Sequence, residues 1–146
     1  MKVKLAGAAL VAALAAAATA NGAQAPVTAT ILAAGKIGAT TIAVKPGGTE
    51  LTSYTVAPGG SFGWHHHNAP VAVIVQQGTL TVLDPKINGC APFKVSKGMS
   101  FVEPAGRVHL ARNDGKTPAK VYAMYLGLPK GAQSTVASAA PHGCSA

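Results

Sequence analysis

Acidic residues are scarce in this chain of 146 residues, which has four Asp and Glu against twelve Lys and Arg. Chemistry that needs a His–Asp type acid/base pair therefore has no candidate pair in the sequence. The formal charge of +8 falls to +6 without Lys2 and Lys4, and the remaining cations are scattered through predicted turns and strand ends with no basic run interleaved with aromatics. This distribution argues against nucleic-acid binding and indicates, at most, a loose attraction to anionic polymers or lipids.

Helical periodicity and long apolar segments are also missing after the first 20 residues. Short runs rich in Val, Ile, Thr and aromatics alternate with Gly and Pro, which is typical of β-strands joined by turns. We predict strands at 37–44, 51–57, 62–65, 71–77, 79–83, 93–96, 100–103, 108–113 and 119–126. Many short antiparallel strands in one small chain predict an all-β sandwich or barrel, and a jelly roll suits this length.

The N-terminus has the pattern of a secretory signal peptide. Lys2 and Lys4 precede an almost unbroken apolar run, and small residues follow it. Sites of the A-x-A type end at Ala20 and Ala25, and we favour Ala20 because cleavage after Ala25 would leave Pro26 first. The run is short and Ala-rich for a retained transmembrane anchor. We therefore expect a secreted or extracytoplasmic protein with no membrane span once the signal is removed.

Cysteine is nearly absent, with only Cys90 and Cys144 in the chain. An even number in an exported protein predicts a disulfide, whereas a reactive or metal-binding pair lacks a C-x-x-C spacing. A bridge would close a loop of about 55 residues and stabilise the fold by roughly 4 kcal/mol. The expected organisation is a signal peptide at 1–20 (at the latest 1–25), one barrel at 26–130 and a tail at 131–146 tied back by the disulfide.

Three consecutive histidines follow a glycine-rich turn and lie inside a predicted strand. Residues two apart on a strand share a face, so His65 and His67 point one way while Trp64 and His66 point the other. Paired imidazoles at this spacing suit one edge of a metal site. An expression tag would also show a histidine run, but the flanking Trp and Pro and the surrounding strand pattern argue against a tag.

These histidines belong to a pattern that resembles the cupins, whose motif is G-x5-H-x-H-x3,4-E-x6-G followed by G-x5-P-x-G-x2-H-x3-N. Nine named positions match across the two elements: Gly59, His65, His67 and Gly78, then Gly98, Pro104, Gly106, His109 and Asn113. The resemblance implies a single-domain cupin jelly-roll β-barrel with His65, His67 and His109 as metal ligands. It also allows a homodimer, since cupins commonly pair edge strands, although the sequence gives no independent sign of an interface.

One motif position departs from the family. The glutamate that is ordinarily a fourth metal ligand is Val71 here. Without it, the three imidazoles form a neutral set that leaves a coordination position open, unless the barrel is a relic without metal. None of the acids that follow the signal peptide is at a motif ligand position: Glu50, Asp84, Glu103 and Asp114. Gln76 or Gln77 could offer a weak amide oxygen, although a glutamine at a strand end is more often solvated.

Strand parity suggests further pocket residues. Arg107 shares a face with His109 and would reach the barrel mouth to anchor a carboxylate, or else point from its turn into solvent. Tyr54 and Tyr125 are candidates to point inward, either to hydrogen-bond a ligand or simply to pack. The rest of the expected lining is apolar, with contributors whose face the sequence leaves open: Phe62, Val71, Val73, Val75 and Phe101. Such a pocket suits a small organic ligand better than a sugar.

The resemblance leaves three kinds of function open. Cupins with three histidines include thiol dioxygenases and some ring- or diketone-cleaving dioxygenases that use Fe(II), so one hypothesis is a dioxygenase-type oxidoreductase. The second is a non-catalytic extracellular cupin that binds a metal or a small molecule, and the third is a structural domain with leftover histidines. Imidazole accepts Fe, Mn, Ni, Cu or Zn, and Fe(II) oxidises readily outside the cell, so the sequence does not name the metal.

Overall fold

The chain's structure, a computed structural model, describes residues 27–145. The predicted signal peptide and both candidate cleavage sites lie outside the described residues. The β-sheets belong to the unit Leu32–Ala146.

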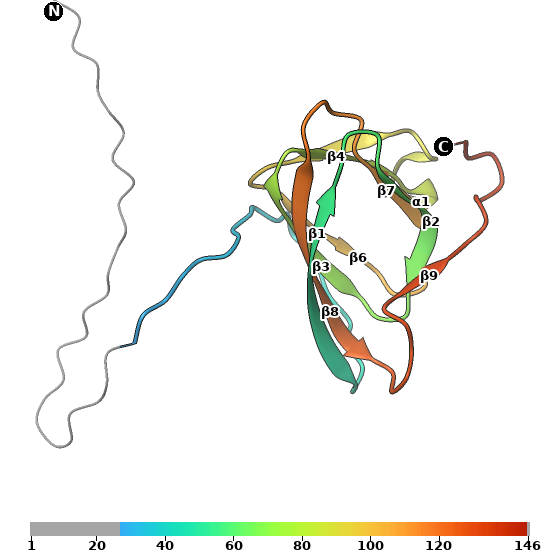
Figure 1. The fold of residues 1–146 in the computed structure, drawn as a ribbon. Coiled ribbons are helices and arrows are strands. Elements are labelled where there is room, and N and C mark those ends of the chain that lie inside the picture. The colour runs from blue at the N-terminus through green and yellow to red at the C-terminus, as the bar shows by residue number, and fades with distance from the viewer. Residues whose placement is uncertain (1–26, 146) are drawn as a thin grey trace, which may run out of the picture. The chain divides into compact units, whose positions relative to one another are not determined.

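Two antiparallel sheets make up the fold (Figure 1), which confirms the predicted all-β class. The strands in chain order are β1 (Gly48–Val56), β2 (Ser61–His67), β3 (Val71–Gln77), β4 (Thr79–Leu83), β5 (Phe93–Ser96), β6 (Ser100–Glu103), β7 (His109–Arg112), β8 (Ala119–Leu128) and β9 (Thr135–Ala137), with helix α1 (Pro85–Asn88) between β4 and β5. One sheet has the order β1-β8-β3-β6 and the other the order β5-β4-β7-β2-β9.

The core lies between the two sheets and is built by strand alternation. On β3 the side chains of Val71, Val73 and Val75 are buried, while those of Ala72 and Ile74 are partly exposed. The same alternation along β8 buries every second residue from Ala119 to Tyr125. Burying one valine contributes about 1.5–3 kcal/mol relative to leaving it exposed, so these two strands supply much of the stability.

The predicted strands agree with the structure to different degrees. Four have the observed bounds: 71–77, 79–83, 93–96 and 100–103. The predicted strand at 37–44 is wrong. Lys36 alone forms a bridge, to Met99, and the residues that follow it are mostly exposed. A composition rich in Ile, Val and Thr favours a strand only where a neighbouring strand offers backbone partners, and residues 37–44 pair with no described strand.

The turn between β3 and β4 explains the second motif glycine. Gly78 has a φ of +73°, and a Cβ placed on it would lie 2.9 Å from the Cα of Ala119. Left-handed backbone and this close approach both disfavour a side chain. The motif glycine therefore serves the packing of the turn against β8.

The C-terminal segment returns to the five-stranded sheet. Strand β9, which the sequence did not predict, pairs with β2 in the register His65↔Ala137 and His67↔Thr135. The predicted disulfide between Cys90 and Cys144 is present and spans 54 residues of sequence. The tail thus contributes a strand beside the histidines.

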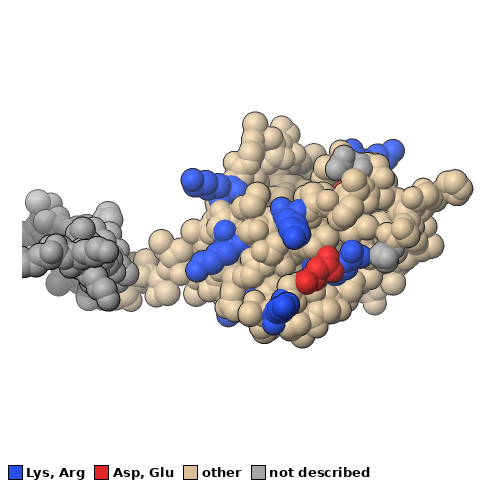
Figure 2. Space-filling view, turned by 90° about the horizontal axis from the view of Figure 1, so that it is seen from above, with Lys and Arg blue, Asp and Glu red and all other residues tan. Residues whose placement is uncertain are grey.

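The surface carries its charges singly on the face that Figure 2 shows, where Lys and Arg side chains stand apart with mostly neutral surface between them. Both arginines have acidic partners: Arg107 with Asp84 and Arg112 with Asp114, each at 2.8 Å. Among residues 27–145, no helix is both long and apolar enough to cross a membrane.

Candidate metal centre

Three histidines converge in the interior of the barrel. His65 and His67 alternate on β2, and His109 begins β7, where it lies directly opposite His65. Residues two apart on a strand and residues opposite each other on neighbouring strands share a face, so the three side chains project together. They are buried, at 4%, 3% and 1% exposure respectively. Their candidate ligand nitrogens lie within 4.8 Å of one another.

The backbone holds all three rings in one tautomer. Nδ1 of His65 donates to the carbonyl of Gly63 at 2.9 Å, and Nδ1 of His109 donates to that of Arg107 at 2.8 Å. Nδ1 of His67 donates to the carbonyl of Ser134 at 3.0 Å. A carbonyl can only accept, so Nδ1 carries the proton and Nε2 of each neutral ring keeps its lone pair. Metal-binding histidines are oriented by second partners of this kind.

A carboxylate that the motif did not predict lies against two of the histidines. Glu103, at the end of β6, has its Oε2 3.0 Å from Nε2 of His67 and its Oε1 3.0 Å from Nε2 of His109. Its side chain is 11% exposed. Neither of these buried ring nitrogens has a partner in hydrogen-bond geometry. The expected neutral set of imidazoles therefore has an anionic neighbour.

The protonation states favour a cation at this place. Burial lowers the pKa of His65 to about 4, so this ring is neutral at neutral pH. Burial alone would raise the pKa of Glu103, but its contacts with His109 and His67 outweigh burial and lower the pKa to about 2. Burial likewise opposes charge on His109, yet the carboxylate of Glu103 raises its pKa. A buried anion beside imidazole lone pairs attracts either a proton or a metal ion.

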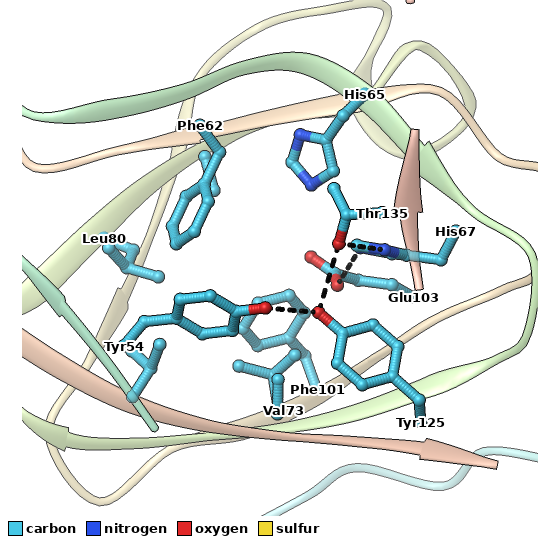
Figure 3. Close-up of a pocket in the computed structure, with 13 residues that line it drawn as sticks. Tyr54, Phe62, His65, His67, Val73, Leu80, Phe101, Glu103, Tyr125 and Thr135 are labelled. Atoms are coloured by element: carbon cyan, nitrogen blue, oxygen red, sulfur yellow. Dashed lines mark hydrogen bonds and ion pairs between the residues drawn. The ribbon is translucent and has the colours of Figure 1, made fainter. Parts of the chain in front are cut away.

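A cavity of about 30 Å³ opens beside His65, His67 and Glu103 (Figure 3). Its other walls are mainly apolar or aromatic: Tyr54, Phe62, Val73, Leu80, Phe101, Ala111, Val121, Ala123, Tyr125 and Thr135. This volume holds about two water-sized molecules. The cavity thus admits a very small ligand next to the candidate metal ligands, and most of the side chains around that ligand are apolar or aromatic.

A chain of hydroxyl groups runs along this wall to His67 (Figure 3). The hydroxyls of Tyr54 and Tyr125 are 3.0 Å apart, and Tyr125 is 3.3 Å from Oγ1 of Thr135. That Oγ1 is 3.3 Å from Nδ1 of His67. Burial raises the pKa of Tyr125, so its hydroxyl stays protonated. The two tyrosines that parity suggested therefore line the cavity and belong to the surroundings of His67.

Two other suggested pocket residues lie elsewhere. Nε of Arg107 is 2.8 Å from Oδ2 of buried Asp84, so the guanidinium pairs with a structural carboxylate and does not line the cavity. Arg107 precedes β7, where strand parity does not apply. Gln77 is exposed and donates to the carbonyl of Pro118 at 3.4 Å, and Gln76 donates to that of Leu32. Neither glutamine replaces the motif carboxylate.

Sequence reasoning missed Glu103 and Thr135. Glu103 directly precedes the Pro-x-Gly of the second motif element, and its parity with Phe101 on one short strand was a usable signal. The decisive relation is the pairing of Val71 with Glu103 between β3 and β6, which a single sequence does not contain. Thr135 lies in a tail of low complexity, where no pattern indicated a strand.

A two-sheet β-barrel with three converging histidines from two adjacent strands defines a candidate metal-binding barrel. Residues 52–125 match the family described as Cupin domain, about half of the chain, and the protein belongs to this family. The predicted cupin fold is thereby confirmed, and a three-histidine cluster in a cupin indicates a transition-metal site.

The chain spans only about two fifths of the length of the curated relatives that it matches. The chain is 36% identical over 89 residues to nectarin-1 of Nicotiana plumbaginifolia, across 60% of this chain and 39% of the relative. It is equally identical over 89 residues to germin-like protein 5-1 of Oryza sativa subsp. japonica, across 60% and 40%. Among solved structures, an oxalate oxidase matches with a TM-score of 0.50 and 28% identity, across 62% of this chain and 46% of that one.

Proposed function

We propose that this protein is an exported cupin that binds one divalent transition metal through His65, His67 and His109 and acts as an oxidoreductase on a small molecule. The observation that carries the proposal is the state of the imidazoles. Each Nδ1 is held by a backbone carbonyl, which leaves Nε2 to serve as a ligand. Nε2 of His67 and Nε2 of His109 are buried with a carboxylate oxygen of Glu103 at 3.0 Å but without a partner in hydrogen-bond geometry, and a bound ion would satisfy both nitrogens.

The donor set fits several metals. Imidazole nitrogens together with a nearby carboxylate suit Fe, Mn, Ni, Cu and Zn, and affinity order alone favours Cu and Zn. A redox-active ion bound here would supply electron transfer to or from dioxygen or the substrate. The chain itself keeps His65 neutral, orients all three histidines through backbone carbonyls, and lines the cavity mainly with apolar and aromatic side chains.

Cavity size supports a small substrate. The cavity of about 30 Å³ beside the histidines is small, so dioxygen and small acids come before ring compounds in order of expectation. The similar oxalate oxidase is named for a small dicarboxylate, which supports the same order. Among residues 27–145, no Lys or Arg lines the cavity, so an anionic substrate would depend on the metal for its attachment.

Elemental analysis of untagged, natively exported protein tests metal binding. We expect about one transition metal per chain, and loss of that metal in His67→Ala. His66→Ala is the matched control, because His66 is on the same strand but bonds to Ser138 at 2.8 Å on the other face. Metal-free wild-type protein under metal-replete conditions, or equal metal content in His67→Ala, contradicts the proposal.

Oxygen consumption separates the enzyme from a binding module. The protein loaded in turn with Fe(II), Mn(II) and Cu(II) is tested with oxalate, thiols, flavonols and diketones. We expect turnover with a small substrate and none with the bulky ones. If stoichiometric metal is present and no substrate is consumed, the function is instead that of a non-catalytic extracellular cupin that binds a metal or a small molecule.

Export is the remaining part of the proposal. The signal-like N-terminus and the disulfide between Cys90 and Cys144 support it, because disulfides persist in oxidising compartments. Mass spectrometry of the mature protein should find an N-terminal peptide that begins at Asn21. Detection of Met1 on the functional protein in the cytoplasm would show that the chain is not exported.

A further inference from the structure

Glu103 lies directly across from the position where the family's motif has its glutamate. Val71 stands at that position on β3, with 0% exposure, and the register pairs it with Glu103 on β6. Residues opposite each other on antiparallel strands project to one face with their Cβ atoms about 5 Å apart. The side chain of Glu103 on β6 can therefore reach the space that a glutamate at position 71 on β3 would occupy.

Glu103 lies at distances from His67 and His109 that are expected between ligands of one ion. Two donor atoms about 2.1 Å from a metal and at right angles are roughly 3.0 Å apart. Each carboxylate oxygen of Glu103 is 3.0 Å from a ring nitrogen, one from His67 and the other from His109. Both nitrogens lack a partner in hydrogen-bond geometry. The two pairs therefore lie at ion-pair distance without meeting hydrogen-bond geometry.

Charge points in the same direction. Both rings donate from Nδ1 to carbonyls, so in their neutral form they turn lone pairs toward a carboxylate that is 11% exposed. Lone pairs and an anion repel one another in a buried site unless a cation lies between them. A divalent ion bound by all three groups would satisfy both nitrogens and the carboxylate together.

We propose that Glu103 is the carboxylate ligand of this metal centre, supplied from β6 in place of the β3 glutamate that Val71 replaces. This inference rests on the proposed metal binding by the three histidines. The site is then a three-histidine, one-carboxylate site rather than a neutral one. The competing arrangement is a metal-independent ion pair between Glu103 and a protonated His109.

Cobalt(II) binding tests the assignment, because affinity and visible absorption both report the ligands without any turnover. Glu103→Gln keeps the shape and removes the charge, and we expect at least about tenfold weaker binding with an altered spectrum. The double variant Val71→Glu/Glu103→Val moves the carboxylate back to the motif position. It should regain most of the affinity and a spectrum like that of the wild type. Asp114→Asn is the control, since this carboxylate is on the surface beside Arg112.

Each outcome decides one question. Wild-type protein that binds no cobalt overturns the proposed metal centre itself. Equal affinity and an unchanged spectrum in Glu103→Gln overturn the role of Glu103 alone and leave the histidine site standing. If Glu103→Gln does not fold, the double variant decides. Tight cobalt binding by the double variant, with the wild-type spectrum, supports the proposal that the Glu103 carboxylate takes the place of the β3 glutamate. A folded double variant that binds no cobalt overturns that proposal.

Discussion

Two buried polar regions of the same barrel differ in how completely their hydrogen bonds are formed. Nδ2 of Asn113 donates to two backbone carbonyls, at 2.9 and 2.8 Å, and its Oδ1 accepts from the amide of Gly115 at 2.9 Å. By contrast, Nε2 of His67 and Nε2 of His109 are buried without a hydrogen-bond partner. Asn113 and His109 are four residues apart and belong to the same motif element.

This difference suggests that Asn113 has a structural role and His109 a ligand-binding role within the same motif element. The backbone of Asn113 also bonds to Gly59 and Gly60, so it fastens the second motif element to the turn that begins the first. An unsatisfied buried polar group costs about 1–3 kcal/mol, and two such groups side by side need a reason. The complete network suits a structural role, and the incomplete one suits the metal site that we propose.

Among the predicted effects, the largest should be the loss of metal affinity when one of the three histidines is removed. For His109→Ala we expect more than about 100-fold weaker metal binding, because loss of a ligand exceeds the usual cost of losing an outer partner. Isothermal titration with Zn(II) measures it, with His66→Ala as the matched variant. Unchanged zinc affinity in His109→Ala would remove the distinction between the two regions.

Asn113→Ala should destabilise the fold without changing the metal site. Three side-chain hydrogen bonds are lost and their backbone partners are left buried, so the free energy of unfolding should fall by about 3 kcal/mol. Urea denaturation measures this loss. Metal stoichiometry should stay at the wild-type value wherever the variant is folded. A variant that loses metal but keeps its stability would reverse the assignment of roles.

Acid should also distinguish the two regions, because Asn113 does not titrate. Burial lowers the pKa of His65 to about 4 from its ordinary 6.5, so between these values the unfolded chain binds more protons. The free energy of unfolding of the metal-free protein should therefore decrease as pH falls through this window, by about 2 kcal/mol from pH 6.5 to 4.5. Denaturation curves of wild type and His65→Asn compare the slopes, and an equal slope in both would reject the role of His65.

The smallest expected effect concerns the outer partner of His67. Thr135→Val removes the hydroxyl 3.3 Å from Nδ1 of His67 but leaves the carbonyl of Ser134 in place. We expect metal affinity to fall by no more than about tenfold, at the lower end for outer partners. Competition with a chelator measures it. A loss as large as that of His109→Ala would mean that the hydroxyl chain is part of the site itself.

Much of the fold could be predicted from local patterns. Alternation in Val71–Gln77 and turn residues around it set this strand and its buried face, and the structure has the same bounds. The period of two along β2 likewise places His65 and His67 on one face before any contact is known. These predictions succeed because side-chain direction on a strand depends only on neighbouring residues.

Predictions that depended on a partner strand fared less well. Residues 37–44 have strand composition but no described strand to pair with, whereas β9 forms in a segment without a strand pattern because the edge of β2 is available. Arg107 precedes its strand, so parity misplaced its side chain beside Asp84. Pairing is a property of two distant segments, and one segment's composition does not report it.

The sequence itself places His65 and His67 on one face, because spacing along a strand determines which side chains share a face. The resemblance to cupins adds His109 as an expected third ligand and marks Val71 as the departure from the motif. The sequence does not show that Glu103 lies opposite Val71. Glu103 reaches the histidines only because β3 and β6 pair in a register that sets it opposite Val71, 32 positions away in the chain. A shift of that register by one residue would turn the carboxylate to the other face, so folding alone decides the charge of the site.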